Sequence, residues 1–213
     1  MNIALIDYRA GNLTSVRKAL GAIGAEVYTP EQASELQKAD GIIVPGVGHF
    51  NVTATLDAPW RDAVLAHVSD RKRPLLGICL GLQWLFEGSE ESPDLPGIGL
   101  LPGRCHLLRV EGLLKVPHVG WNTLDTMIGS GAAGRAAAPR VLRDVPDQAY
   151  AYFTHSFVAP VTEACVATST HGQTFAAVVE RGLVMGAQFH PEKSGDVGLA
   201  ILRNFVTLAE ECR

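Results

Sequence analysis

The chain has 213 residues, of which 47% are hydrophobic and 19% are charged, and these proportions exclude a disordered protein. Its formal net charge of −4 argues against a nucleic-acid-binding protein, because such proteins usually carry a basic surface. The first residues include Asp7 and no basic cluster, and the longest apolar stretch, residues 74–86, is too short to span a bilayer. We therefore expect a cytoplasmic protein whose residues 1–213 form one domain.

Short apolar runs alternate with helical patterns in the first part of the chain. The patterns predict strands over residues 2–7, 25–28, 41–45 and 75–78, and helices over residues 13–23, 30–38, 60–68 and 80–86. Strands that are separated by helices in this order form a parallel sheet with right-handed crossovers.

The second half of the chain is richer in strands. Strands are predicted over residues 104–109, 115–119, 149–158, 164–170, 175–180 and 183–190, with a final helix over residues 198–211. Short turns between these strands favour antiparallel pairing. Residues 128–139 are almost only Gly, Ala and Ser, which predicts a mobile surface loop. The expected fold is a three-layer α/β domain with a mostly parallel central sheet and an antiparallel extension in its C-terminal half.

Cys79 lies in a G-x-C-x-G pattern, residues 77–81, between a predicted strand and a predicted helix. This setting is typical of a nucleophile elbow, at which glycines let the chain turn sharply and expose the nucleophile above the sheet. The helix N-terminus favours a thiolate, and the backbone N–H of Leu80 can point toward a reacting carbonyl. The alternative is an inert buried cysteine, the commoner fate of a free cysteine. The remaining cysteines lack this setting, and their spacing indicates neither a disulfide framework nor a metal site.

His190 is the best candidate among seven histidines for the base that a cysteine nucleophile needs. It ends a predicted strand, and Glu192 follows two residues later, so both side chains can lie on the same face of an extended segment. Glu192 can then accept a hydrogen bond from one ring nitrogen while the other nitrogen faces Cys79. Without Cys79, the pair would be interpreted as a strand-end histidine and a solvated glutamate.

The sequence resembles the class I (triad) glutamine amidotransferases in three motifs: GICLGLQ at residues 77–83, QFHPEKS at 188–194 and PGVGHF at 45–50. Within this family it is similar to the glutaminase subunits of imidazole glycerol phosphate synthase. Three further segments carry this similarity: IDYRAGN at 6–12, KVPHVGWN at 115–122 and YFTHSF at 152–157. The motifs follow the family order along essentially the whole chain. Arg9 departs from the family pattern, because the family usually has glycine at this position. The resemblance implies a flavodoxin-like three-layer fold, and no cofactor or metal.

The resemblance implies that Cys79, His190 and Glu192 form a triad that hydrolyses glutamine to glutamate and ammonia. The oxyanion would lie between the N–H of Leu80 and an N–H of the loop that contains Val47 and Gly48, and a peptide flip in this loop could control activity. The family pattern also assigns glutamine binding to the side chains of Gln83 and Glu91 and to the main chain of Ser156 and Phe157.

The resemblance further implies a heterodimer with a (β/α)₈ synthase subunit that receives the ammonia. The residues expected to face this partner are Asn12, Pro117, His118, Trp121, Asn122 and Lys193. Residues 115–122 do not fit a plain strand, because Pro117 interrupts the run, and we expect His118 to be exposed. Aromatic and polar groups of this kind are typical anchors of interfaces, although a core position is the alternative for Trp121.

Three other functions compete with this interpretation. Glutaminase subunits of pyridoxal phosphate, anthranilate or guanylate synthesis share the triad, and only the segments 45–50 and 115–122 argue against them. A stand-alone cysteine hydrolase of the same fold would need no partner. A non-enzymatic flavodoxin-like binding module would make the Cys-His-Glu set a coincidence, and its usual phosphate loop is missing.

Overall fold

The computed structural model describes residues 1–127 and 138–213. In this part of the chain a nine-stranded sheet has the strand order β2-β1-β3-β4-β13-β12-β11-β8-β9. In chain order its strands are β1 (Asn2–Leu5), β2 (Glu26–Tyr28), β3 (Gly41–Val44), β4 (Leu75–Ile78), β8 (His118–Thr126), β9 (Ala149–His155), β11 (Cys165–His171), β12 (Gln173–Arg181) and β13 (Val184–Ala187). Except for Ala138 and Pro139, the loop expected over residues 128–139 lies outside the described residues.

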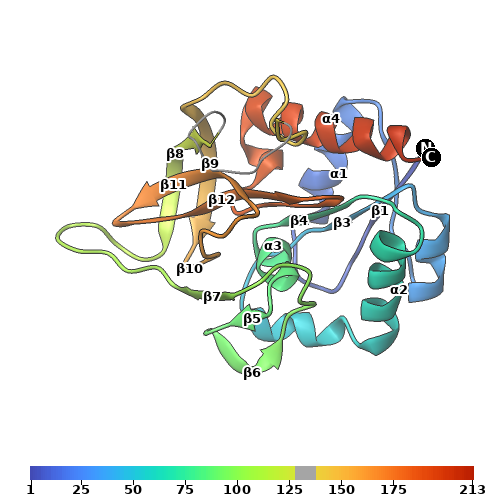
Figure 1. The fold of residues 1–213 in the computed structure, drawn as a ribbon, viewed down its shortest axis with the longest axis horizontal. Helices are drawn as coiled ribbons and strands as arrows, with labels where there is room; N and C mark the ends of the chain where they lie inside the picture. The colour runs from blue at the N-terminus through green and yellow to red at the C-terminus, as the bar shows by residue number, and fades with distance from the viewer. Residues whose placement is uncertain (128–137) are drawn as a thin grey trace.

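The large sheet changes from parallel to antiparallel pairing at β13. The pairs that join β2, β1, β3, β4 and β13 are all parallel, and those that join β13, β12, β11, β8 and β9 are all antiparallel. Figure 1 shows the antiparallel strands β8, β9, β11 and β12 extending away from the parallel core. The predicted parallel sheet with an antiparallel C-terminal extension is therefore confirmed.

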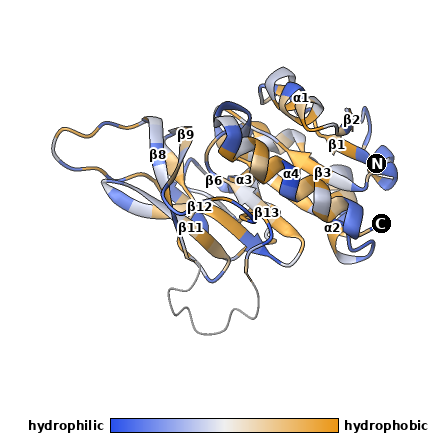
Figure 2. Cartoon of the chain, turned by 90° about the horizontal axis from the view of Figure 1, so that it is seen from above, coloured by the Kyte–Doolittle hydropathy of each residue, from blue (hydrophilic) through white to orange (hydrophobic). Residues whose placement is uncertain are grey.

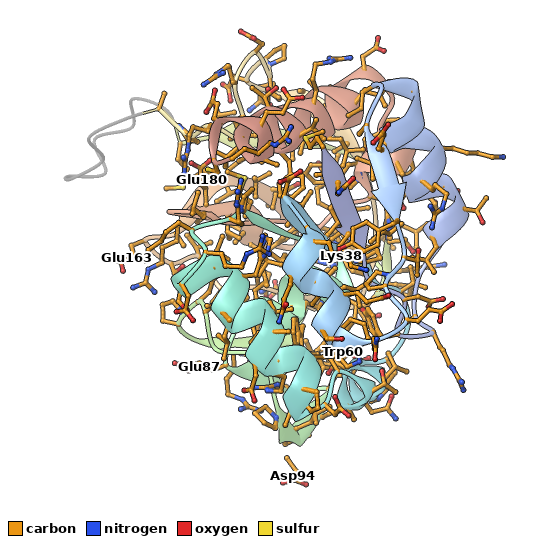
Figure 3. The ribbon with its side chains drawn as sticks, turned by 90° about the vertical axis from the view of Figure 1, so that its right-hand side faces the viewer. Lys38, Trp60, Glu87, Asp94, Glu163 and Glu180 are labelled. Carbon is orange, nitrogen blue, oxygen red and sulfur yellow. The ribbon has the colours of Figure 1, made fainter. Side chains whose placement is uncertain are left out.

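Helices cover both faces of the parallel part. The α-helices are α1 (Leu13–Ala22), α2 (Ala58–Ser69), α3 (Leu80–Leu85) and α4 (Gly195–Glu211), and the 3₁₀ helices are η1 (Ala33–Lys38), η2 (Phe50–Thr55) and η3 (Pro191–Lys193). In Figure 1, α1 and α4 lie on one side of β1, β3 and β4, and α2 and α3 lie on the other. Figure 3 views the flank on which α2 and η1 lie in front, with exposed side chains such as Lys38 and Asp94 pointing to solvent.

The alternation of side chains along β1 divides the core into two layers. Ile3 and Leu5 pack with α1 and α4, whereas Ala4 and Ile6 pack with the α2 side of the sheet. Successive residues of a strand point to opposite faces, so a strand covered on both sides must be apolar throughout. Figure 2 shows β1 and β3 coloured as hydrophobic beside the helices α1 and α4.

A second, four-stranded sheet was not predicted from the sequence. Its order is β10-β7-β5-β6, with β5 at Gly88–Ser89, β6 at Ser92–Pro96, β7 at Arg104–Leu107 and β10 at Phe157–Val158. The strand β5 has only two residues and β6 contains two prolines, so neither shows an apolar alternation. The strand β5 pairs antiparallel with β6 and parallel with β7, and β10, distant in the sequence, pairs with β7.

Several strand boundaries differ from the predictions. The strand predicted over residues 115–119 begins only at His118 and continues to Thr126, because Pro117 has no N–H for a sheet ladder. The strand predicted over residues 149–158 divides at Ser156 into β9 and β10, which belong to different sheets. The predicted helix over residues 30–38 is a 3₁₀ helix that begins at Ala33.

Candidate active site

The carboxyl ends of three parallel strands meet at one edge of the large sheet. In the register of the sheet, Val44 of β3 is opposite Gly77 of β4, and Ile78 of β4 is opposite Ala187 of β13. The residues that follow these strands therefore emerge side by side. The edge brings together the glycine loop after β3, Cys79 after β4, and the segment 188–192 after β13, which is the arrangement expected for a ligand site in an open α/β sheet.

Cys79 occupies a sharp turn between β4 and α3. Its backbone has φ +52° and ψ −105°, a conformation that L-residues rarely adopt and that is typical of a nucleophile elbow. A side chain at Gly81 would place its Cβ 1.8 Å from the carbonyl oxygen of Val44, and one at Gly77 would approach the carbonyl oxygen of Gly81 to 2.6 Å. Both glycines are therefore required for α3 to pack so closely on the strands.

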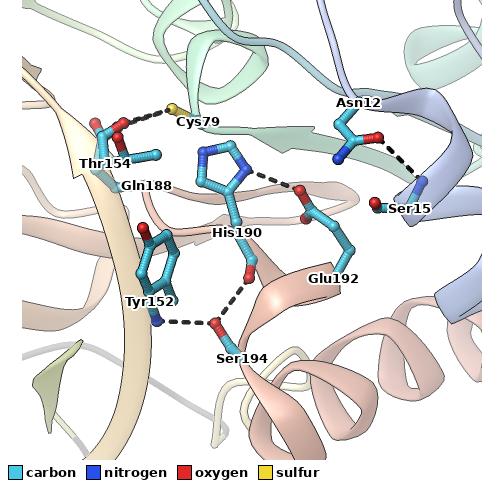
Figure 4. Close-up of polar contacts among 9 residues, drawn as sticks. All are labelled: Asn12, Ser15, Cys79, Tyr152, Thr154, Gln188, His190, Glu192 and Ser194. Carbon is cyan, nitrogen blue, oxygen red and sulfur yellow. Dashed lines mark hydrogen bonds and ion pairs between the residues drawn. The ribbon is translucent and has the colours of Figure 1, made fainter. Parts of the chain in front are cut away.

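His190 and Glu192 form a buried pair beside this turn. His190 Nδ1 lies 2.9 Å from Glu192 Oε1, and only 2% of each side chain is exposed. Figure 4 shows the His190 ring between Cys79 and Glu192. Because Glu192 accepts a hydrogen bond from Nδ1, His190 Nε2 is directed to the Cys79 side, and Nε2 has no hydrogen-bond partner among the described residues.

The charge state of His190 depends on its two neighbours. Burial by itself would lower the pKa of His190, but the adjacent Cys79 side chain and the Glu192 carboxylate outweigh it and raise this pKa from 6.5 to about 10. An imidazolium beside a sulfur nucleophile and a carboxylate can deliver a proton to a leaving group. The geometry and the charge distribution therefore suit nucleophilic catalysis by Cys79.

Two residues at this site were not selected from the sequence. Gln188 donates a hydrogen bond from Nε2 to Cys79 Sγ at 3.8 Å, and the Ser194 hydroxyl donates to the carbonyl oxygen of His190 at 2.7 Å. Ser194 also accepts from the backbone N–H of Tyr152 at 2.9 Å, so it ties the segment after β13 to β9 (Figure 4). Both residues lie inside the motif QFHPEKS, and their closeness to His190 in the sequence was the available signal.

A cavity of about 340 Å³ opens over Cys79. All the residues predicted to bind the oxyanion or glutamine line this cavity: Val47, Gly48, Leu80, Gln83, Glu91, Ser156 and Phe157. Pro117, Thr154 and His155 complete its wall. Gln83 is buried and donates from Nε2 to the carbonyl oxygen of Phe157 at 3.0 Å. Glu91 accepts from the backbone N–H of Phe50 at 2.7 Å, which holds its carboxylate at the cavity wall.

The glycine loop is held against the elbow by one backbone contact. The N–H of Leu80 lies 3.4 Å from the carbonyl oxygen of Gly46. A side chain at Gly46 would place its Cβ 2.1 Å from the Tyr8 hydroxyl, so only glycine fits there. Gly48 has φ +95° and open space around it, and Val47 between them is exposed. In this conformation the N–H expected to bind an oxyanion is engaged by a carbonyl.

Three of the predicted partner-facing residues are exposed and belong to neighbouring elements. Trp121 on β8 is 56% exposed and its ring lies 6.0 Å from that of Tyr152, over which the Lys193 ammonium lies at 5.6 Å. Asn12 is exposed at the start of α1, where its side chain accepts from the N–H of Ser15 (Figure 4).

The expected exposure of His118 is wrong. His118 is 4% exposed, because its ring packs between Phe153 and His171, with centroid distances of 5.0 Å and 4.2 Å. Asn122 is half-buried, and its Nδ2 donates to the carbonyl oxygen of Thr170 at 2.9 Å. Pro117 is exposed, but it lines the cavity.

Arg9 adopts a backbone conformation that favours glycine. Its φ of +63° lies in the left-handed region, and its N–H donates to the Asp7 carboxylate at 2.8 Å. Such a local side-chain contact is typical of an Asx turn.

In the part of the chain that the structure describes, no group of three or more His, Cys, Asp or Glu side chains could hold a metal ion, and no helix is long and apolar enough to cross a membrane.

The comparisons with known proteins agree with this fold and site. The family model of class-I glutamine amidotransferases matches residues 4–209, and the chain belongs to this family. Among curated proteins, the chain is similar to "Imidazole glycerol phosphate synthase subunit HisH" of Gloeobacter violaceus, with 47% identity over 98% of this chain and 90% of that protein. It is 43% identical to the proteins of the same name from a Synechococcus strain and from Halalkalibacterium halodurans, over 98% or more of this chain and at least 95% of each relative.

Solved structures support the fold. The crystal structure of a glutamine amidotransferase has a TM-score of 0.73 and covers 97% of this chain and 98% of its own, at 19% identity. The structure of PurLQS from Thermotoga maritima has a TM-score of 0.66, covers 97% of each chain, and is also 19% identical.

Proposed function

We propose that this chain is the glutaminase subunit of an imidazole glycerol phosphate synthase, and that residues 1–213 act as one glutamine amidotransferase domain in the cytoplasm. The observation that carries the proposal is the position of His190, which is hydrogen-bonded to Glu192 and faces Cys79. Cys79 in turn lines the 340 Å³ cavity. The full-length similarity to the HisH proteins supports the choice of this enzyme over other amidotransferases.

The first half-reaction forms a thioester on Cys79. The sulfur attacks the side-chain amide carbon of glutamine, and the C–N bond breaks as His190 gives its Nε2 proton to the leaving nitrogen. Ammonia departs and a γ-glutamyl group remains on the sulfur. In the second half-reaction, His190 takes a proton from water, whose oxygen attacks the thioester, and glutamate and the Cys79 sulfur are released.

Glu192 keeps the imidazole in the productive state. Its carboxylate accepts from Nδ1 at 2.9 Å, which leaves Nε2 for proton transfer and stabilises the imidazolium that the cycle requires. Ser194 holds the backbone of His190 through its 2.7 Å hydrogen bond. The pair therefore needs little reorganisation when the reaction begins.

The cavity wall is suited to an amino acid. The Glu91 carboxylate would bind the α-ammonium of glutamine, and the main chain of Ser156 and Phe157 would bind its α-carboxylate, with Gln83 contacting the substrate beside Cys79. All four residues line the same cavity, which supports this assignment.

The oxyanion hole is the proposed control point. The Leu80 N–H is engaged by the Gly46 carbonyl at 3.4 Å and is therefore not free to stabilise the tetrahedral intermediate. The second donor, which Val47 or Gly48 would supply, is not in place either. Losing one such donor typically costs about 10²–10³ in rate. A flip of the peptide between Gly46 and Val47 would remove the carbonyl and present an N–H, so the partner can activate the enzyme by favouring the flipped state.

The partner would be a (β/α)₈ cyclase subunit that docks on the face of Asn12, Trp121 and Lys193, with Pro117 and Asn122 at its border. This subunit would use the ammonia to convert a phosphoribulosyl formimino carboxamide nucleotide to imidazole glycerol phosphate and an aminoimidazole carboxamide ribotide. Ammonia released into neutral water is protonated and no longer nucleophilic, so direct transfer is required for efficient coupling.

Product analysis of the mixed subunits tests this function. With glutamine and the nucleotide present, the proposal expects glutamate and imidazole glycerol phosphate in a one-to-one ratio, and no product from the acceptors of pyridoxal phosphate, anthranilate or guanylate synthesis. If glutamine hydrolysis instead supplied ammonia to one of those other acceptors, the chain would be the glutaminase subunit of that other amidotransferase. Hydrolysis of peptides or other γ-glutamyl compounds by the chain alone would indicate a stand-alone hydrolase.

A further inference from the structure

Two buried histidines that the proposed chemistry does not use are joined end to end. His118 Nδ1 lies 3.1 Å from His155 Nε2, and His155 Nδ1 lies 3.1 Å from the carbonyl oxygen of Phe157. At the other end, Asn122 Nδ2 lies 3.4 Å from His118 Nε2. The four groups form one hydrogen-bonded chain from β8 across the end of β9 to the first residue of β10.

The Phe157 carbonyl and the Asn122 amide, at the two ends of this hydrogen-bonded chain, determine which nitrogen of each ring carries the proton. A carbonyl oxygen can only accept, so His155 carries its proton on Nδ1 and leaves Nε2 as an acceptor. His118 must then donate from Nδ1, which leaves its own Nε2 to accept from the Asn122 amide. All three hydrogen bonds of this series can form together only when both rings are neutral and both carry the proton on Nδ1.

Burial favours this neutral state. Burial and, to a smaller extent, the proximity of other histidines lower the pKa of His118 to about 4 and that of His155 to about 3. The titratable groups that act on His155 are His118, His171 and His190, and none of these is an anion that would stabilise a charged ring. Both rings also pack against Phe153 and Phe175.

One end of the hydrogen-bonded chain lies in the wall of the glutamine cavity. The Phe157 carbonyl that accepts from His155 also accepts from Gln83 Nε2 at 3.0 Å, and His155, Ser156 and Phe157 all line the cavity. The contact from the His155 side chain to the carbonyl two residues later closes a turn around Ser156. The opposite end, Asn122, is the residue after the exposed Trp121.

We propose that His118 and His155 are positioning residues for glutamine binding, which hold the turn at Ser156 and Phe157 in the conformation that accepts the α-carboxylate. This inference deepens the proposed function and rests on it for its kinetic consequence. His118 acts only through His155, so its removal loosens the turn without touching substrate or the Cys79 sulfur. The expected signature is a higher KM for glutamine with little change in kcat.

A pair of His118 variants separates the hydrogen bond from the packing. In His118→Phe the ring remains and the donor is lost, whereas in His118→Asn the amide nitrogen takes the place of Nδ1 and can still donate to His155. In the complex with the synthase subunit, His118→Phe should raise KM about three- to tenfold, the effect of one lost hydrogen bond, with kcat within about twofold. His118→Asn should keep KM within about twofold of the unmodified protein.

His67→Phe is the matched control. His67 is also buried and also bonds a backbone carbonyl, that of Pro74 at 3.2 Å, but it lies on α2 outside the cavity lining. This variant should lower the melting temperature and leave KM unchanged. An unchanged KM in folded His118→Phe, or equal KM values in His118→Phe and His118→Asn, would overturn the proposal.

Nuclear magnetic resonance of the unmodified chain with ¹⁵N-labelled histidine provides a test that needs no activity. His118 and His155 should both show the Nδ1–H tautomer and should not titrate between pH 8 and about pH 5. An Nε2–H tautomer or titration near the ordinary histidine value at either residue would contradict the proposed arrangement, even if His118→Phe failed to fold. Absence of any glutaminase activity in the unmodified complex would instead refute the proposed function, while the tautomers would still decide the arrangement.

Discussion

The backbone N–H of Leu80 donates to the carbonyl oxygen of Gly46 at 3.4 Å. The oxyanion of the proposed mechanism would need this N–H, so the contact describes a resting state in which Cys79, His190 and Glu192 are assembled but one stabilising donor is engaged. The nucleophile and base require no rearrangement. Activation then depends on the loop after β3, whose glycines allow the peptide to turn.

Gly48→Ala should weaken the inactive resting state of the loop more than it impairs folding. Gly48 has φ +95°, which strains an alanine by about 1–2 kcal/mol, although its Cβ would meet no atom within 4 Å. Because this strain acts on the resting conformation, in which the Leu80 N–H is engaged, it should raise the population of the flipped peptide. We expect glutaminase turnover of the isolated chain to rise by about fivefold or more, as measured by glutamate release.

Gly182→Ala is the control for Gly48→Ala. Gly182 also has positive φ, +61°, and open space, but it lies in the turn between β12 and β13. Its substitution should reduce the free energy of unfolding by a similar amount and leave turnover unchanged. Equal turnover of the two isolated variants, or a loss in Gly48→Ala, would contradict the proposed role of the loop.

Replacement of Cys79 by Ser should abolish glutamine hydrolysis while the melting temperature and partner binding stay close to those of the unmodified protein. The prediction follows from the elbow conformation of Cys79 and its position beside the His190 ring. Loss of a nucleophile typically costs about 10⁶ in kcat. Alkylation of Cys105, Cys165 or Cys212 instead of Cys79 by a reactive glutamine analogue would contradict the assignment.

Glu192→Gln should lower the pKa of His190 and reduce kcat by about 10²–10⁴. In the folded protein this pKa is raised to about 10 from 6.5, so the pair stabilises the fold fully below pH 6.5, and the contribution is lost as the pH rises through about 10. The difference in unfolding free energy between the unmodified protein and Glu192→Gln should therefore be largest at pH 6 and smaller at pH 10. A difference that grows with pH would contradict the proposed pairing.

Trp121→Ala should weaken binding of the synthase subunit by about tenfold or more, because an exposed aromatic side chain is a common anchor of an interface. Calorimetric titration of the two subunits measures the effect. Trp60→Ala, on α2 at the flank seen in Figure 3, serves as the matched control and should leave the affinity unchanged. A stronger effect of Trp60→Ala would place the partner on the α2 side.

The sequence predicted the triad cluster because its geometry depends on strand order and local pattern. Gly77 and Gly81 mark the elbow, and a parallel arrangement of β4 and β13 is sufficient to bring Cys79 beside His190. The sheet of β5, β6, β7 and β10 could not be predicted in this way, since β5 and β10 have only two residues each, β6 contains two prolines, and β10 joins β7 from far along the chain.

The burial of His118 illustrates the same limit at the level of one side chain. The pattern of residues 115–122 suggested an exposed histidine, but β8 continues to Thr126 and pairs with β9, and this register directs His118 toward Phe153 and His171. The face of a strand on which a residue lies depends on register, and a shift of one position reverses it. Among the residues of this segment expected to face a partner, Trp121 and Pro117 are exposed.

The central claim is that an incomplete oxyanion hole keeps the chain inactive until its partner is loaded. Glutamate release should be measured for the isolated chain, for the complex, and for the complex with the nucleotide substrate, all at saturating glutamine. The account predicts that turnover in the nucleotide-loaded complex exceeds that of the isolated chain by about 10² or more, the size of one oxyanion donor. Equal turnover in the isolated chain and in the loaded complex would contradict it.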